Sequence, residues 1–585
     1  MAVENLITEH IDIWTSAVKT KSASGRGSNK KLELYGVKKL RELILELAVR
    51  GKLVPQDPND EPASVLLERI AAEKTQLVKE KKIKKQKALP EVTEQEAPFN
   101  VPKGWEWTRL GNLSSDIHYG YTASAKSNSE GVRLLRITDI QNDKVNWGTV
   151  PACDITEEKA KSYLLENDDI LIARTGGTIG KSYLVENIDL QAVFASYLIR
   201  VKRVQAVYAP FTKVFLGSQL YWKQLIENSA GTGQPNVNAT ALKQLLFIVP
   251  PFNQQKRIVA KVDELMALCD QLEQQTEASI EAHQVLVTTL LDTLTNSADA
   301  DELMQNWARI SEHFDTLFTT EESIDQLKQT ILQLAVMGKL VSQDPNDEPA
   351  AKLLERIAEE KASLIKEKII RKPKKMKDWV ELDRPFALED GAEWVRLGDL
   401  CFTVADGPHF SPQYVEKNEG VPFLSTRNIS SSNIDMESAK YVSHEDHEEF
   451  CKRVKVKKGD VLYTKGGTTG IAKVNDLDIE FSVWVHLAVL QIPNDKLLNE
   501  YLALALNSPH CYIQSQTYTN GIGNKDLGLT RMINITLPLY PLNKQYRIVE
   551  KAKALIVICD QLKARLKESQ STQQYLTDAI VEQVV

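Results

Sequence analysis

Residues 47–74 read LAVRGKLVPQDPNDEPASVLLERIAAEK and residues 334–361 read LAVMGKLVSQDPNDEPAAKLLERIAEEK, and 23 of the 28 aligned positions are identical. The offset between the two stretches is 287 residues (334 − 47 = 287), about half of the 585-residue chain. Self-similarity at a fixed offset indicates an internally duplicated architecture. The chain is therefore predicted to be a tandem duplication with pseudo-twofold symmetry between its halves.

The similarity continues through both halves but is uneven. DILIAR (169–174) matches DVLYTK (460–465), GGTIG (176–180) matches GGTTG (466–470), and RIVAKVDELMALCDQL (257–272) matches RIVEKAKALIVICDQL (547–562). Residues 114–168 and 401–459 share little beyond short apolar patches. A duplicated chain that keeps its frame and varies its inserts is expected to use the frame for geometry and the inserts for two different recognitions.

Two long segments, 254–296 and 543–585, carry apolar residues at alternating spacings of four and three, which is the heptad pattern of a helix with one packing seam. A helix of ~40 residues extends about 60 Å. Symmetry between the halves predicts an antiparallel coiled-coil pair, and the core of an ordinary helical bundle is the alternative. The residues expected at this helix-pair interface are Ile258, Val262, Leu265, Cys269, Leu272, Ile548, Leu555, Cys559 and Leu562.

Shorter amphipathic helices are predicted at 37–50 and 324–337, and each precedes a proline-rich turn, at 56–62 or 343–349. A second helix follows each turn and ends in a lysine run, KEKKIKK (79–85) or KEKIIRK (366–372). Such a run is either a solvated helix end or a contact with DNA phosphate or a protein partner.

The segments between the helices have strands and helices in alternation, which predicts α/β (α+β) domains. Strands are expected at 132–137, 169–173, 197–202, 421–425, 460–463 and 484–492, and helices at 214–226 and 497–507. The chain then divides into an N-terminal helical region (1–99), a first variable domain (100–252), a central helical spacer with the second copy of the helical region (253–387), a second variable domain (388–542) and a C-terminal long helix (543–585).

The loops of the variable domains are rich in glycine, amides and aromatic residues. Amide side chains suit adenine edges, and a cation beside a glycine turn suits phosphate. The same residue types also form ordinary turns, and that alternative stays open at each position. The candidates for DNA contact are His118, Tyr119, Tyr121, Lys126, Arg174, Thr175, Gly176, Gln234, Asn236, Asn238, His409, Lys465, Gly466, Asn520, Asn524 and Lys525.

Motifs that resemble catalytic or metal sites are incomplete. GGTIGKS (176–182) lacks the first glycine of a phosphate-binding loop, because position 175 is threonine. VPPF (249–252) lacks the hydrogen-bond acceptor that opens the tetrapeptide of amino-methyltransferases. His444, His447 and Cys451 share one helical face but supply only three ligands, so surface residues are the preferred interpretation over zinc. No catalytic residue and no metal site are expected.

Composition limits the setting of the protein. The net charge of −7 argues weakly against autonomous DNA binding but leaves room for local basic surfaces. Six scattered cysteines without a C-x-x-C pair indicate reduced thiols, and the N-terminus lacks the pattern of a secretory signal. No apolar run is long enough for a membrane span, so no membrane partner is expected. These features favour the cytoplasm.

The ordered, duplicated set of motifs resembles the specificity subunits of Type I restriction–modification systems. The matching pieces are DILIARTGGTIGK (169–181), GQPNVN (233–238), the Pro250-Pro251 segment through Val259, and LCDQL (268–272) with its copy around Cys559. The duplicated KLVPQDPNDEP segment (52–62) resembles the longer-chain Type IB branch. In the second half KDLG (525–528) replaces PNVN, and Lys465 replaces Arg174.

The resemblance implies the remaining expectations. Each variable domain would be a target-recognition domain that reads one half of a bipartite site in double-stranded DNA, with the helical pair setting the spacer. Two modification subunits would bind S-adenosylmethionine and methylate adenine N6 after base flipping. Two restriction subunits would add translocation and cleavage that use ATP and Mg²⁺. This chain would bind no cofactor and would not be an enzyme.

Three other functions are weighed against this one. A stand-alone methyltransferase or nuclease would need the missing cofactor and catalytic motifs. A coiled-coil adaptor would not need two divergent α/β inserts. A DNA-binding scaffold or regulator that acts without restriction partners remains the main alternative.

Overall fold

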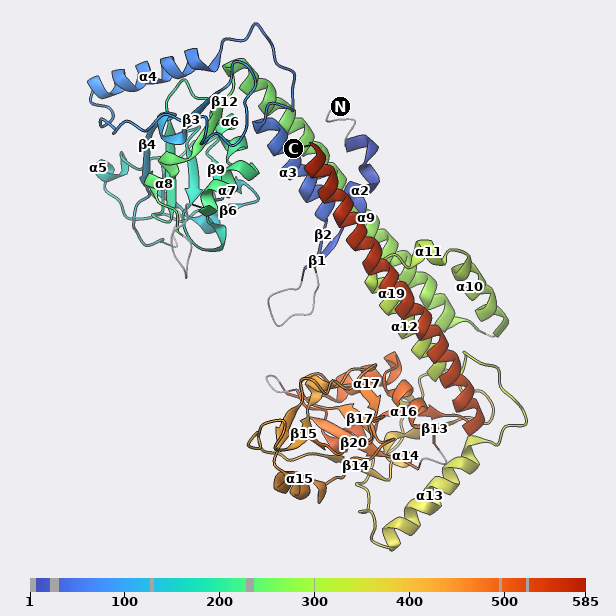
Figure 1. Ribbon diagram of the computed structural model, residues 1–585. Helices are drawn as coiled ribbons and strands as arrows, with labels where there is room; N and C mark the ends of the chain where they lie inside the picture. The colour runs from blue at the N-terminus through green and yellow to red at the C-terminus, as the bar shows by residue number, and fades with distance from the viewer. Residues whose placement is uncertain are drawn as a thin grey trace. The chain divides into compact units, whose positions relative to one another are not determined.

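The computed structural model describes residues 7–21, 31–126, 131–227, 236–298, 300–493, 497–521 and 525–584. Its contacts divide the chain into two compact units, Met1–Ser279 with Ser569–Val585 and Ile280–Glu568. Two long helices, α9 (Phe252–Asn296) and α19 (Leu542–Val584), each contribute residues to both units (Figure 1). Each unit therefore combines parts of both long helices with one α/β domain.

In the first unit, the short helix α3 (Tyr35–Val49) contacts both long helices (Figure 1). Arg41 of α3 pairs with Asp270 and Glu273 of α9, both at 2.7 Å. On α19, Asp578 accepts a 2.7 Å hydrogen bond from the Tyr35 hydroxyl. The apolar face of α3 is buried through Leu40, Leu43, Ile44 and Leu47, in agreement with the predicted amphipathic helix. The same unit holds α2 (Ile11–Ser16), β1 (Lys19–Lys21) and β2 (Lys31–Glu33).

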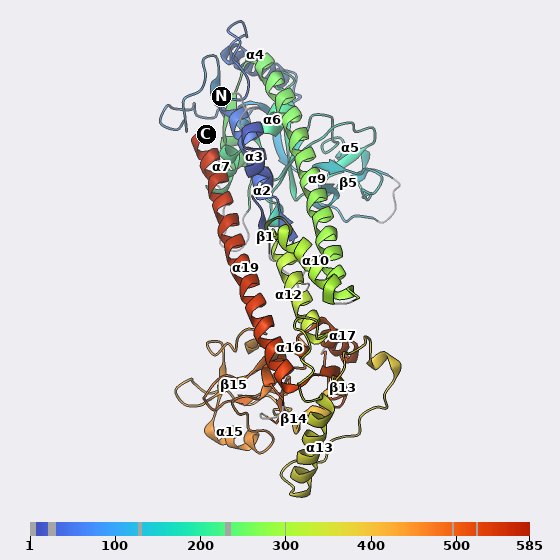
Figure 2. The same cartoon turned by 90° about the vertical axis from the view of Figure 1, so that its right-hand side faces the viewer.

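In the second unit, α12 (Glu321–Val336) takes the corresponding place. Lys328 of α12 pairs with Asp560 of α19, and both residues are the repeat partners of Arg41 and Asp270 (41 + 287 = 328; 270 + 290 = 560). Helices α10 (Ala300–Glu312) and α11 (Phe314–Leu317) connect α9 to α12 (Figure 2). The duplication is therefore retained in individual contacts.

Side-chain contacts give the directions of the helices in the second unit. Hydrogen bonds join Gln284 to Glu322 and Thr288 to Gln326, so α9 and α12 run in the same direction. Ion pairs join α12 to α19 in the opposite order, because Lys328 meets Asp560 whereas the earlier Asp325 meets the later Lys563. The predicted antiparallel course of the long helices is thus confirmed within this unit.

The apolar seams predicted on the two long helices are buried, but they do not pack against each other alone. Ile258, Val262, Leu265, Cys269, Ile548 and Cys559 are buried, and Leu272, Leu555 and Leu562 are half-buried. In the second unit the seam of α19 shares one apolar core with α12 and with Val287, Leu291 and Leu294 of α9. The expectation of a two-helix interface therefore needs a correction: a third, short helix packs into it, because α12 also has an apolar face to bury.

The two variable domains have the same central sheet despite their divergent sequences. The first domain orders four antiparallel strands as β4-β11-β8-β9, and the second orders them as β14-β20-β17-β18. The strands of the first sheet are β4 (Ser114–Tyr119), β11 (Leu198–Arg203), β8 (Ile170–Ala173) and β9 (Ser182–Leu184). Those of the second are β14 (Thr403–Asp406), β20 (Leu487–Gln491), β17 (Val461–Thr464) and β18 (Ala472–Val474).

Smaller strand pairs complete each domain. In each domain, the first strand pairs antiparallel with the last strand. These pairs are β3 (Glu106–Arg109) with β12 (Leu246–Val249) in the first domain, and β13 (Glu393–Arg396) with β21 (Thr536–Leu539) in the second. A parallel pair joins β5 (Arg133–Leu135) to β10 (Ala192–Phe194) and β15 (Val421–Leu424) to β19 (Ser482–Val483). Additional strands are β6 (Ile140–Gln141), β7 (Lys144–Val145) and β16 (Lys440–Val442).

The helix predicted at 214–226 is instead two helices, α6 (Ala209–Phe215) and α7 (Gln219–Glu227). Gly217 lies between them, where an added Cβ would approach a Leu45 methyl group to 2.9 Å. Ser218 then accepts a hydrogen bond from the backbone N–H of Tyr221 at 3.3 Å and starts the second helix. The other domain helices are α5 (Glu157–Ala160), α8 (Ala239–Gln244), α14 (Leu397–Leu400), α15 (His444–Cys451), α16 (Asn499–Leu506), α17 (Pro509–Tyr518) and α18 (Leu529–Met532).

The proline-rich turn of each half is tied to the start of a long helix by an ion pair. Asp60 accepts from Arg257, and at the repeat-related position Asp347 accepts from Arg547, whose Nη2 lies 2.6 Å from Oδ2. The Asp347 side chain is only 4% exposed. Its hydrogen bond from Arg547 lowers the pKa of the Asp347 carboxyl below its ordinary value. The ion pair therefore connects the frame to the helix that leaves the domain.

We expect Arg547→Met to destabilise the protein by about 1–3 kcal/mol, because it leaves a buried carboxylate without its charged partner. Arg547→Lys, which retains a charge, should cost less. Asp347 has a lowered pKa in the folded state. The extra stability of wild type over Arg547→Met is therefore fully present at pH values above the ordinary carboxyl pKa. It is lost as pH falls through the folded-state pKa. Thermal unfolding at neutral and acidic pH measures this difference, and an equal difference at both pH values would contradict it.

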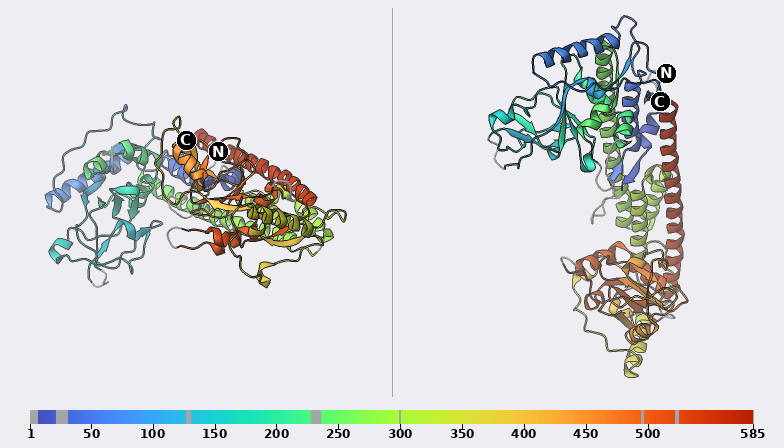
Figure 3. Two further views of the ribbon diagram at one scale, coloured as in Figure 1. Left: turned by 90° about the horizontal axis from the view of Figure 1, so that it is seen from below. Right: turned by 60° about the vertical axis from the view of Figure 1, so that its left-hand side comes forward.

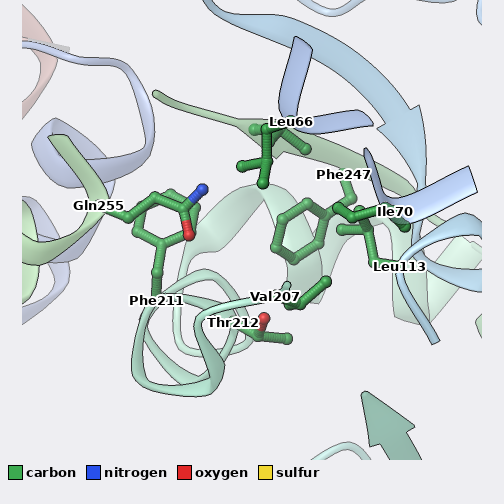
Figure 4. Close-up of a pocket in the computed structure, with 9 residues that line it drawn as sticks. Leu66, Ile70, Leu113, Val207, Phe211, Thr212, Phe247 and Gln255 are labelled. Carbon is green, nitrogen blue, oxygen red and sulfur yellow. The ribbon is translucent and has the colours of Figure 1, made fainter. Parts of the chain in front are cut away.

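Helix α4 (Ala63–Lys79) lies along one side of the first variable domain, and α13 (Ala350–Lys366) is its repeat partner (Figure 3). Leu66 and Ile70 of α4 face Phe247 and Phe211 across a small, largely apolar cavity (Figure 4). These apolar contacts hold α4 against the domain.

A lysine adds a polar attachment for each of these helices, and it is half-buried in α4 (Lys74) and buried in α13 (Lys361). Lys74 Nζ donates to the carbonyl oxygen of Gly111 at 2.9 Å, and Lys361 Nζ donates to that of Gly398 at 2.5 Å. Burial, with a smaller contribution from the charge of Lys243, lowers the pKa of Lys74 from 10.5 to about 8.

We expect wild type to gain stability relative to Lys74→Met as pH rises from about 8 to 10.5. In this range the unfolded chain keeps the Lys74 proton and the folded chain releases it, so deprotonation favours folding. Thermal unfolding at pH 7.5 and 9.5 measures the effect, with a substitution of the exposed Lys103 to Met as the matched control. The same difference in thermal stability between wild type and Lys74→Met at both pH values would contradict the lowered pKa of Lys74.

Candidate DNA interface

Three chain segments meet around Arg174 at the end of β8 in the first variable domain. The Arg174 guanidinium lies 4.6 Å from the ring centroid of Tyr119, which ends β4. Its Nε donates to Oδ1 of Asn236 at 3.4 Å. The backbone N–H of Val237 donates to the Arg174 carbonyl at 3.0 Å and fixes the loop. Within the described residues, Arg174 forms no ion pair with a carboxylate, so its charge is not neutralised there.

The second domain has the same arrangement around Lys465, but carboxylates surround this cation. Lys465 directly follows β17, and its Nζ lies 3.4 Å from Asp406 and 2.9 Å from Asp526. The backbone N–H of Leu527 donates to the Lys465 carbonyl at 2.7 Å, as Val237 does to Arg174. Asp406 and Asp526 occupy the repeat positions of Tyr119 and Asn236 (119 + 287 = 406; 236 + 290 = 526).

Asp406 is almost fully enclosed by cations. Its side chain is 2% exposed and accepts from Arg453, whose Nε also donates to the Asp406 carbonyl oxygen at 2.7 Å. The imidazole of His409 lies 3.4 Å from the same carboxylate, although 62% of the His409 side chain is exposed. Lys465 itself is only 5% exposed, so its charge holds Asp406 and Asp526 together rather than facing solvent.

The loop residue beside each cation therefore differs in its hydrogen-bonding capacity. The Asn236 amide can donate and accept, which suits an adenine edge, whereas the Asp526 carboxylate only accepts, which suits the cytosine amino group. The Asp526 side chain is 42% exposed and remains accessible. One backbone geometry thus presents two different chemistries.

The structure aligns the glycine turns that follow Arg174 and Lys465 differently from the sequence match, by one residue. Thr175 forms a β-bridge with Asn236, and Gly466 forms the corresponding bridge with Asp526. Gly176 and Gly467 then share the left-handed backbone conformation, with φ of 74° and 73°. The GlyGlyThr alignment of 176 with 466 is therefore corrected to 175 with 466. Gly466 is glycine because an added Cβ would lie 1.9 Å from the His486 ring.

Other predicted contacts lie inside local networks. His118 is 3.0 Å from Asp116 and 3.1 Å from Arg200, and its side chain is 25% exposed. The hydrogen bond from His118 lowers the pKa of the Asp116 carboxyl. Tyr121 packs against Tyr163, with ring centroids 5.5 Å apart.

The remaining predicted residues lie on loops. Lys126 is exposed and pairs with Asp154 at 2.5 Å. The exposed Asn238 caps α8 by accepting from the backbone N–H of Ala241 at 2.8 Å. Asn520 exchanges two backbone hydrogen bonds with Asp526, and Lys525 between them is exposed. Gln234 and Asn524 lie outside the described residues.

Sequence reasoning missed the polar groups that surround Lys465. Asp406 and Asp526 could have been found by extending the repeat offsets to Tyr119 and Asn236. Two further groups had no sequence signal: Trp484 Nε1 and His486 Nδ1 are buried and have no hydrogen-bond partner among the described residues. Burial and the nearby charge of Lys465 lower the pKa of His486, which favours the neutral imidazole.

The residues considered for zinc form a packing contact. His447 is buried, which corrects the expectation of a surface residue, and its Nδ1 lies 2.8 Å from the Ser482 hydroxyl. Across the part of the chain that the structure describes, no cluster of three or more His, Cys, Asp or Glu residues could hold a metal ion. No described helix is both long and apolar enough to cross a membrane.

Comparison with known families connects this geometry to a function. The family model described as the Type I restriction modification DNA specificity domain matches residues 102–282 and 389–569. The chain belongs to this family. Each matched stretch contains one α/β domain, so the subunit has two target-recognition domains.

Full-length relatives agree with this assignment. The Type I restriction enzyme EcoAI and EcoEI specificity subunits of Escherichia coli are both 38% identical to the chain. The alignments cover all of this chain and 100% and 99% of the relatives. A solved HsdS subunit from Thermoanaerobacter tengcongensis is 18% identical, with 83% of this chain and 98% of that chain covered and a TM-score of 0.41. The protein is a specificity subunit, a non-catalytic DNA-recognition component of a Type I system.

We expect exchange of the loop residues to alter each domain separately. Asn236→Asp places a carboxylate beside Arg174, as in the second domain, and should weaken binding of the first half-site by roughly tenfold, the range of one good base contact. Asp526→Asn should affect only the second half-site. Binding titrations with duplexes altered in one half-site measure both variants. The control is Asn146→Asp, which makes the same chemical change in an exposed turn and keeps the acceptor for the Gly148 N–H. Equal losses at both half-sites would contradict separate readout.

Proposed function

We propose that this specificity subunit reads a bipartite target in double-stranded DNA, with one half-site contacted by each recognition domain. The observation that carries the proposal is the paired site at Arg174 and Lys465. Its three segments and backbone hydrogen bonds are repeated in both domains, whereas the side chains that meet the cation differ. Two copies of one geometry with different donors and acceptors are suited to two different base sequences.

The subunit directs chemistry that its partners perform. Two modification subunits bind S-adenosylmethionine and methylate adenine N6, and two restriction subunits use ATP and Mg²⁺ for translocation and cleavage. These reactions place the complex in the cytoplasm with the chromosomal DNA. The present chain supplies the choice of site and binds none of these cofactors.

Repeat-related apolar residues on the long helices support two equivalent partner positions. Leu268 of α9 and Ile558 of α19 are 41% and 46% exposed, at an offset of 290 residues. Leu286 and Leu576 are 49% and 47% exposed at the same offset. Each unit thus displays one member of both pairs, and exposed apolar groups at matching positions suit two copies of one partner.

The decisive experiment maps N6-methyladenine across a host genome by polymerase-kinetics sequencing. The host expresses this chain with and without a modification subunit of the same system. We expect methylation at one split, asymmetric motif only when both proteins are present. The Asn236→Asp variant is the matched test, because it should change one half of the motif and leave the other half unchanged.

The same experiment separates the alternative function. A stable complex of the two proteins without any new methylated motif would overturn the proposal as an active system. That result would favour a DNA-binding scaffold or regulator that acts without restriction partners.

A further inference from the structure

We infer that the lysine-rich segments that follow α4 and α13 bind the phosphate backbone of DNA beside each half-site. Basic segment 1 is residues 79–87, and basic segment 2 is residues 366–377. Segment 1 has six lysines and one glutamate, and segment 2 has seven lysine or arginine residues and one glutamate, for net charges of +5 and +6. The whole chain carries −7, so the positive charge is concentrated at two repeat-related places. The inference rests on the proposed DNA-reading function.

Both segments begin with the same backbone conformation. Lys81 and Lys368 adopt the left-handed region, with φ of 57° and 59°. The N–H groups of Lys82 and Ile369 donate at 2.9 Å to the carbonyls of Leu77 and Leu364, five residues earlier. This is the hydrogen-bond pattern of a Schellman cap, and it turns the chain off the helix in the same direction in both halves.

The residue in the left-handed position is unusual for such a cap. Glycine is favoured there, and a side chain costs roughly 1 kcal/mol. The chain uses glycine at the ends of α3 and α12, where Gly51 and Gly338 have φ of 69° and 74°. After α4 and α13 both halves keep lysine instead, although other positions of the segments differ, such as Gln86 and Pro373. Retention of the charge at this cost indicates that the lysine side chain has a use.

Contacts on the inner side hold each segment against its recognition domain. Gln86 Nε2 donates to the Ser115 carbonyl at 2.8 Å, next to the start of β4. In the second unit, Lys374 Nζ donates to the Thr530 hydroxyl at 3.0 Å, and the Lys377 N–H donates to Asn534 at 2.8 Å. Thr530 belongs to α18, which directly follows the loop that carries Asp526. Basic segment 2 is therefore continuous with the recognition loop of its domain.

Most of the basic side chains face solvent. The exceptions are Lys374, whose Nζ donates to Thr530, and Lys377, whose Nζ lies 5.3 Å from the Tyr518 ring centroid. All six lysines of segment 1 and all seven basic residues of segment 2, these two included, are exposed. Among the described residues, the only ion pair within these segments joins Lys82 to Glu80 at 2.8 Å. The anchored backbone thus presents cations that the protein itself leaves almost entirely unneutralised.

A nucleic acid fits these surfaces better than a protein does. Lysine is depleted at protein–protein interfaces, which favour aromatic residues, methionine and arginine. Flexible ammonium groups instead suit phosphate, where they release condensed counterions without reading sequence. The segments are therefore assigned to positioning and affinity, and the loops around Arg174 and Asp526 to base recognition.

The test neutralises each segment in the full chain, purified with its modification subunits. One variant is K81Q/K84Q/K85Q/K87Q, and the other is K368Q/R371Q/K372Q/K375Q. Binding is titrated across a salt series with a duplex that carries the methylated motif and with a scrambled duplex. We expect affinity for both duplexes to fall roughly tenfold, and the slope of log affinity against log salt to decrease by about 0.9 for each phosphate that the variant no longer neutralises. The methylated motif should be unchanged.

Two controls distinguish charge from folding. Lysine-to-arginine variants at the same positions keep the charge and should retain the wild-type salt slope. Lys81→Gly and Lys368→Gly relieve the backbone and should raise thermal stability while they reduce the slope. An unchanged slope in both neutralised variants would overturn the inference. Loss of complex assembly with unchanged DNA binding would also overturn the inference and assign the segments to a protein partner. Absence of a methylated motif with the wild-type chain would instead overturn the proposed function.

Discussion

The ion pair between each proline-rich turn and the first part of a long helix is the contact on which the architecture of each half depends. Asp60 meets Arg257, and Asp347 meets Arg547. These contacts join residues about 200 positions apart, so each one closes a whole recognition domain between its entry and its exit. A carboxylate that is nearly buried requires its charged partner, because an unpaired charge in that place is costly.

With the frame closed in this way, the domains can change without loss of geometry. The strand orders β4-β11-β8-β9 and β14-β20-β17-β18 are the same, although residues 114–168 and 401–459 have little sequence in common. The variation is concentrated where strand ends and loops meet. There the Arg174 guanidinium lies over an aromatic ring and beside an amide, whereas Lys465 lies between two carboxylates.

Charge has two separate uses in the molecule. Lys361 and Lys465 are buried and Lys74 is half-buried, and all three attach helices or loops to the domains. The lysines after α4 and α13 are exposed and almost unpaired. The overall charge of −7 conceals this division, which explains why net charge was a weak guide to a DNA-binding function.

The amino-acid sequence was sufficient to predict the duplication, the helical frame, the positions of most strands and the family. Repeats and heptads are local patterns, and the repeated LAVxGKLVxQDPNDEP stretch needs no tertiary information to be recognised. The third helix in the seam and the break at Gly217 were decided by the tertiary structure, because each depends on packing against a distant segment such as α12 or Leu45. Tertiary structure also decided which cations face solvent. Lys465 and Lys84 are alike in sequence, but only the first lies beside two carboxylates that come from positions 406 and 526.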